Sequence, residues 1–77
     1  MVATYRITVT NKTFTSSAEG NYGSDRDAAE QAVQGAIAIA ADEIRKGEAL
    51  FMADIKIERD GQVVGHCAVS VGCSPLA

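Results

Sequence analysis

The sequence predicts a single α+β domain, residues 1–77, with four strands and one helix in the order ββαββ. Residues 2–10 and both stretches after residue 50 alternate apolar and polar residues, which is the period of a half-buried strand, and residues 13–18 can pair with the first of them with Phe14 and Ala18 on its apolar face. Between them lies one segment with the 3.6-residue period of a helix and with recognisable start and stop signals. We therefore expect one helix packed on one face of a mainly antiparallel four-stranded sheet, in which the strands are ordered second, first, third, fourth.

The first two predicted strands form a hairpin, and they cover approximately residues 2–10 and 13–18. In the first strand, aliphatic and tyrosine side chains alternate with threonine and arginine, so one face is apolar and the other is solvated. A two-residue turn that pairs Val9 with Phe14 places the apolar side chains of both strands on one face. Residues 19–23 are then predicted to form a loop.

The predicted helix covers residues of about 25–46. Ser24 supplies an N-cap hydroxyl, and acidic residues occupy the first turn, where the helix dipole favours them. At the other end two cations precede Gly47, which is free to take the left-handed conformation that ends a helix. The 3.6-residue period predicts a face in contact with the sheet, made of Ala29, Val33, Ala36, Ile37, Ala40 and Ile44.

A second, narrower strip of the helix has two interpretations. Either it is the edge of a wide buried face, or its small residues let a second helix approach closely and form a dimer contact. The strip consists of Ala28, Ala32, Gly35 and Ile39.

The closing hairpin is predicted from strands of about 50–59 and 62–73. A two-residue loop would pair Ile57 with Val64 and would turn the apolar residues that follow towards water. A three-residue loop closed by a glycine bulge pairs Ile57 with Val63 and keeps that apolar row buried. On this burial argument we expect the three-residue loop, followed at the end of the chain by a short tail, residues 74–77.

The predicted register also places the cysteine and histidine side chains, which are the most reactive groups in the chain. Cys67 and Cys73 are expected in the core, where thiols behave as small hydrophobic groups. His66 is expected opposite Asp54 on the exposed face, and we interpret this pair as a surface contact rather than an acid–base pair. His66 and Cys67 point to opposite faces of one strand, and the paired cysteines of a zinc knuckle are absent from the sequence. We predict no catalytic residue, no metal and no cofactor.

Charge and composition argue against several classes of function. The net charge is −3, and the seven cations are scattered rather than gathered in the basic stripe that binding to nucleic acid requires. No apolar stretch reaches membrane-spanning length, and the first residues lack the pattern of a signal peptide. We expect a cytoplasmic chain that binds a protein partner and does not contact nucleic acid or membrane directly.

The chain resembles a family of small bacterial proteins of unknown function. These proteins pair an N-terminal strand with a Glu-Gly loop, a helix that opens with Asp-x-x-Ala-Ala, and a closing hairpin. The matching pieces are Glu19-Gly20, Asp25 to Ala29, Glu43 to Gly47, and Ile55 to Val64. The resemblance implies the fold and transfers no activity.

The chain is also similar to dodecins, small strand–helix–hairpin proteins that assemble into hollow dodecamers storing flavin. The similar segments are residues 5–7, 31–33 and 36–38, and the Asp60-Gly61 hairpin that ends at Val71-Gly72. Flavin-binding dodecins stack the flavin on a tryptophan, and this sequence contains none. The resemblance therefore implies a similar assembly more than it implies flavin chemistry.

Two main functional hypotheses follow. The first is a non-enzymatic protein-interaction module that acts as a homodimer, such as an accessory or inhibitor protein of bacterial or phage origin in the class of anti-CRISPR proteins. The alternative is a dodecin-like oligomer that stores a small ligand such as flavin, and metal binding through the two thiols is a third hypothesis. The candidate interaction surface consists of Ala28, Ala32, Gly35, Ile39, Met52, Asp54 and His66.

Overall fold

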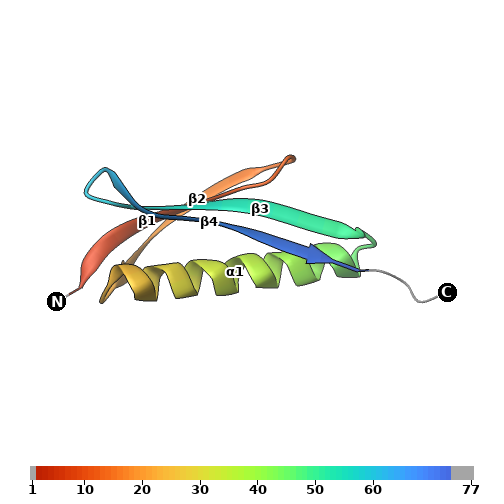
Figure 1. The fold of residues 1–77 in the computed structure, drawn as a ribbon, viewed down its shortest axis with the longest axis horizontal. Helices are drawn as coiled ribbons and strands as arrows, with labels where there is room; N and C mark the ends of the chain where they lie inside the picture. Colours follow the sequence, from red (N-terminus) through yellow and green to blue (C-terminus); the bar gives the residue numbers. More distant parts are fainter. Residues whose placement is uncertain (1, 74–77) are drawn as a thin grey trace.

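The computed structural model describes residues 2–73 and has the predicted ββαββ order. The elements are β1 (Ala3–Thr10), β2 (Thr15–Tyr22), α1 (Asp25–Arg45), β3 (Leu50–Arg59) and β4 (Gln62–Gly72). The strands form one antiparallel sheet in the order β2-β1-β3-β4, and α1 runs along one face of it (Figure 1). The predicted fold class and strand order are therefore confirmed. The predicted tail, residues 74–77, lies outside the described residues.

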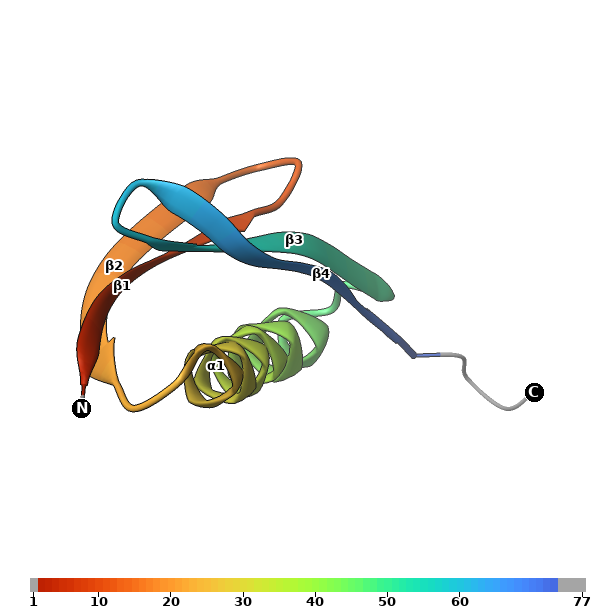
Figure 2. The ribbon, with the colours of Figure 1, turned by 60° about the vertical axis from the view of Figure 1, so that its left-hand side comes forward.

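The sheet arches over the helix rather than lying flat on it. Figure 2 looks along α1 from its N-terminal end, with β1 and β2 on one side of the helix and the end of β4 on the other. The opposite face of the sheet is covered by no second layer in the described part of the chain.

β2 is longer than predicted, and its register with β1 is shifted by two residues. Val9 lies opposite Ser16, and the predicted pairing of Val9 with Phe14 is wrong. The strand continues to Tyr22, through residues 19–22, where the sequence predicts a loop. These residues are mostly small or polar, so no alternation of hydrophobicity marks them as a strand.

The shift has a local cause in the turn between β1 and β2. The side-chain oxygen of Asn11 accepts hydrogen bonds from the backbone N–H and the hydroxyl of Thr13, at 2.9 and 3.0 Å. The backbone N–H of Asn11 donates to the carbonyl oxygen of Phe14 at 2.8 Å. This asparagine-closed turn favours a four-residue loop over the two-residue turn of the predicted register.

The second hairpin has the two-residue loop, so the prediction of a three-residue loop is wrong. Asp60 and Gly61 form this loop with φ angles of 54° and 77°. Two consecutive positive φ angles are the conformation of a type I′ turn, for which Asp-Gly is a favoured pair. The backbone conformation that these two residues prefer therefore favours the two-residue loop over the three-residue loop.

A bulge just after the loop restores the burial that a regular two-residue hairpin would lose. Glu58 lies opposite Val63, whereas the next residue back along β3, Ile57, lies opposite Gly65. Val64 is therefore an extra residue in β4, and the strand beyond it is turned back into phase with the core. A β-carbon at Gly65 would come within 3.2 Å of the Ile57 side chain, so a residue without a side chain suits this position.

The observed register changes the predicted places of the cysteines and of the histidine. Cys67 faces the helix side of the sheet and is half-buried, whereas Cys73 is exposed, so the prediction that both thiols lie in the core is wrong for Cys73. His66 is exposed, as expected, but it lies opposite Lys56 and not opposite Asp54. The bulge and the shorter loop together move the pairing by two residues.

The core combines large side chains from the sheet with alanines from the helix. Its buried members are Tyr5, Val9, Phe51, Ala53, Ile55 and Ile57 from the strands, and Ala28, Ala32, Ala36 and Ala40 from α1. The predicted helix face is therefore partly wrong, because Ile37 is 48% exposed and Ala28 takes a central place. A row of alanines four residues apart lets the helix come close to a sheet whose own side chains fill the core.

Both ends of α1 form as predicted. The hydroxyl of Ser24 accepts a hydrogen bond from the backbone N–H of Asp27 at 3.1 Å. Gly47 has a φ of 109°, and its N–H donates to the carbonyl oxygen of Ile44 at 3.0 Å. These caps fix the length of the helix, and the short connection that follows leads directly into β3.

Candidate functional site

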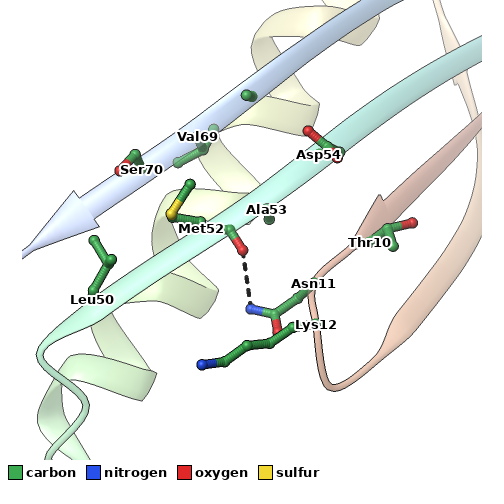
Figure 3. Close-up of a pocket in the computed structure, with 10 residues that line it drawn as sticks. Thr10, Asn11, Lys12, Leu50, Met52, Ala53, Asp54, Val69 and Ser70 are labelled. Atoms are coloured by element: carbon green, nitrogen blue, oxygen red, sulfur yellow. Dashed lines mark hydrogen bonds between the residues drawn. The ribbon is translucent and has the colours of Figure 1, made fainter.

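A shallow groove lies on the sheet face that points away from α1, near the start of β3 and the end of β4 (Figure 3). Its volume is about 460 Å³. We call it the outer groove, and it is lined by Thr10, Asn11, Lys12, Leu50, Met52, Ala53, Asp54, Ala68, Val69 and Ser70.

The groove exists because β1 is shorter than β3 at this end of the sheet. Thr10, the last residue of β1, pairs with Asp54, whereas β3 begins four residues earlier at Leu50. The first residues of β3 therefore have no strand beside them on the β1 side. Instead, the side-chain amide of Asn11 donates a hydrogen bond to the carbonyl oxygen of Met52 at 3.2 Å, which fixes the turn against β3 (Figure 3).

The groove offers apolar surface together with one charge of each sign. Leu50 and Met52 are 55% and 60% exposed, and both project from the open stretch of β3. Figure 3 shows Lys12 reaching from the turn after β1 towards the start of β3, with Asp54 further along the strand. Within residues 2–73, neither Lys12 nor Asp54 takes part in an ion pair. Both charges are thus available to a molecule bound in the groove.

A polar cluster lies at the start of α1. The hydroxyl of Tyr5 and the guanidinium of Arg59 each donate a hydrogen bond of 2.6 Å to the same carboxylate oxygen of Asp25. Asp25 is the first residue of α1, where the helix dipole stabilises a negative charge. The cluster therefore joins the start of α1 to β1 and β3, and we assign it a structural role.

The hydrogen bond from Tyr5 to Asp25 raises the pKa of Tyr5, and burial of the ring raises it further. Ionised tyrosine has no proton to donate, so ionisation breaks this contact. We therefore expect Tyr5 to ionise above the ordinary tyrosine pKa of 10.0. The stabilisation that this shift provides is complete below that pH and is lost as the pH rises through the pKa of Tyr5 in the folded chain.

The ultraviolet absorbance of tyrosinate measures this ionisation. In a Tyr22→Phe variant, Tyr5 is the only tyrosine that remains, and circular dichroism shows whether the chain stays folded at each pH. Adding Asp25→Asn to the same background is expected to bring the transition back towards 10.0. A folded Tyr22→Phe variant that titrates like free tyrosine would contradict the proposed role of Asp25.

On the sheet, the structure keeps all the predicted surface residues exposed but does not bring them all together. Met52 and Asp54 line the outer groove. His66 lies on the same face of the sheet beside Lys56, outside the groove. Lys12 and Leu50, which the sequence does not single out, complete the groove because the ends of β1 and β3 are staggered.

On the helix, the predicted strip divides between core and surface. Ala28 and Ala32 are buried beneath the sheet, as the interpretation of the strip as part of a wide buried face requires, so these two do not belong to the candidate interaction surface. Ile39 is partly buried, and Gly35 is exposed on α1. The reason is the rotation of the helix, which turns these alanines, rather than its larger aliphatic residues, towards the middle of the sheet.

In residues 2–73, no group of three histidine, cysteine or acidic side chains lies close enough together to hold a metal ion. The one helix of this part of the chain is not apolar enough over a sufficient length to cross a membrane. Comparison with known proteins gives no family: no protein-family model, no curated protein and no solved structure matches the chain. The case for a function therefore rests on the residues and on their geometry.

Proposed function

We propose that the chain is a non-enzymatic protein-interaction module whose partner binds in the outer groove. The observation that carries this proposal is the pair of exposed apolar side chains, Leu50 and Met52, on the open stretch of β3. Neighbouring apolar side chains at a surface are typical of contact sites. Methionine suits such a site because its unbranched, polarisable side chain adapts to the shape of a partner.

The backbone of β3 supplies a second means of recognition. Its first residues extend beyond the end of β1, so this edge of the strand faces the groove instead of another strand. An extended segment of a partner can lie along it, as in proteins that bind peptides by adding a strand to a sheet. The side chain of Asn11, bonded to the Met52 carbonyl, limits this added pairing to a few residues.

The charges in the groove define the chemistry of the partner further. We expect an extended protein segment with an apolar side chain that contacts Leu50 and Met52, and with an acidic side chain that reaches Lys12. Such a segment gains apolar burial from the strand and an ion pair at the rim of the groove. An accessory or inhibitor protein of bacterial or phage origin acts in this way, by occupying a partner's surface.

Selection from a library of random displayed peptides tests the proposal directly. We expect the selected peptides to combine an apolar residue with an acidic residue, and the Met52→Asp variant to bind them at least about tenfold more weakly. Val63→Asp is the matched control, because Val63 is 57% exposed on the same face of the sheet but lies outside the groove. Selection of no peptide, or equal binding by both variants, would contradict the proposal.

Storage of a small ligand in a dodecin-like oligomer remains the alternative proposal. The groove volume of about 460 Å³ is within the range of pockets for small ligands, which favours it. The lining residues include no aromatic side chain on which a flavin ring would stack. Titration with flavin mononucleotide separates the proposals: stoichiometric binding that Met52→Asp abolishes would support storage, and would argue against a peptide as the natural occupant.

A further inference from the structure

β4 is an edge strand with an unusual composition. It is eleven residues long, and no Asp, Glu, Lys, Arg or Pro occurs between Gln62 and Gly72. Edge strands of soluble proteins usually carry charges or proline, which prevent pairing with another chain. Most of β4, beyond the bulge at Val64, is therefore suited to pairing with a further strand.

The inward-facing row of β4 is only partly covered. Cys67, Val69 and Val71 point to the helix side of the sheet, yet all three are only half-buried. The residues that they pair with on β3 are fully buried. The helix thus covers the β3 row completely and leaves an apolar margin along β4.

One flank of α1 continues this apolar margin. In the view of Figure 2, from the N-terminal end of α1, the sheet lies above the helix and the later part of β4 descends on its right. A right-handed helix turns clockwise when seen from this end, so the residue after each buried alanine is turned towards β4. These four residues are all apolar: Ala29, Val33, Ile37 and Ala41.

The other flank of the helix differs in character. By the same helix geometry, the residues that precede the buried alanines lie on the opposite flank, and they are Asp27, Gln31, Gly35 and Ile39. Apolar side chains therefore gather on the β4 side. We call this surface the β4 flank, defined by Val33, Ile37, Ala41, Cys67, Val69 and Val71.

We propose that a second copy of the chain covers the β4 flank. The two β4 strands pair antiparallel about a two-fold axis, which gives one continuous sheet with both helices on the same face. A two-fold interface brings the same surface together from both copies, so a charge close to the axis meets its own kind. With a net charge of −3, the chain meets a copy of itself most favourably where the surface is uncharged, and the β4 flank is such a surface.

The size of the β4 flank fits a stable dimer. Beyond the bulge, residues 65–72 of β4 span about 26 Å, and the middle extent of the molecule, which runs through sheet and helix in Figure 1, is 20 Å. The flank therefore offers about 500 Å² per copy, and the two copies together bury about 1,000 Å², which is the least area expected of a specific interface.

Light scattering on a chain-concentration series measures the assembly. We expect a mass of twice the chain's 8.0 kDa, and for Ile37→Lys a dissociation constant raised by at least about tenfold, because the new charge would be buried in the interface. Met52→Lys is the control, since Met52 is exposed to a similar extent but lies in the outer groove, and this variant should remain dimeric. Circular dichroism checks that both variants keep their helix.

Hydrogen exchange then locates the interface. Arg59 and Gln62 flank a two-residue loop, so the backbone N–H of each donates a hydrogen bond to the carbonyl oxygen of the other. Going back along β3 from Arg59, every second residue forms the same pair of backbone hydrogen bonds with its partner on β4. The intervening residues of β4 point their N–H groups to the free edge, and among them are His66, Ala68 and Ser70. We expect these amides to be protected in the dimer and to exchange rapidly in Ile37→Lys.

Three results would overturn the proposal: a monomer at millimolar chain concentration, a larger closed oligomer, or a dimer in which these three amides stay unprotected. Each of them leaves the proposed function open to its own test, because the peptide selection depends on Leu50 and Met52, which do not belong to the β4 flank.

Discussion

Replacing Ile55 with alanine is expected to lower the free energy of unfolding by about 3–4 kcal/mol, which is typical of removing a large aliphatic side chain from a core. Ile55 is fully buried and is one of the three largest such side chains, with Tyr5 and Ile57. The helix opposite contributes alanines, which are too short to move into the cavity. Small domains have little stability in reserve, so this one change is expected to leave a large unfolded fraction.

Urea denaturation followed by circular dichroism measures the effect. Met52→Ala is the matched control on the same strand, because its side chain points to the other face and is 60% exposed. We expect that variant to stay within about 0.5 kcal/mol of the parent chain. All variants are compared at one chain concentration, since self-association adds to the apparent stability. A loss below about 1 kcal/mol for Ile55→Ala would contradict the central place of this residue in the core.

The predictions that succeeded rest on local patterns. The alternation in β1 and β3 places the correct face of each strand on the helix, because a strand has only two faces and one of them was clearly apolar. Ser24 and Gly47 mark the helix ends, because a cap depends on a few neighbouring residues. The predicted strand order is also confirmed, although two hairpins joined by one helix allow other orders as well.

The predictions that failed concern how one element meets another. Each hairpin register depends on one local feature, which is the turn closed by Asn11 in the first hairpin and the bulge at Val64 in the second. The predicted registers also keep the apolar side chains on one face, so burial alone does not distinguish them from the observed registers. The rotation of α1 is equally ambiguous, since alanines and larger aliphatic residues alternate around half of its surface. Packing decides in favour of alanine because the sheet already fills the core.

The outer groove could be predicted only in part for the same reason. Met52 and Asp54 are recognisable as outward-facing residues of a strand, but Lys12 and Leu50 join them only because β1 ends opposite Asp54. That end point is set by the Asn11 turn, which the predicted register lacked. The Tyr5 cluster likewise draws its members from three elements, and no spacing in the sequence connects them.

Replacing Ala32 with leucine is expected to cost about 2–3 kcal/mol, because the larger side chain would force the helix away from the sheet. Ala32 is buried beneath the sheet, whereas Ala38 is exposed on the same helix, so Ala38→Leu is the control and should change stability little. Thermal and urea unfolding measure the cost, and light scattering is recorded on the same samples. If Ala32→Leu instead left stability unchanged and shifted the dimer equilibrium, the Ala28–Ile39 strip would be the interface. The β4 flank would then no longer explain self-association.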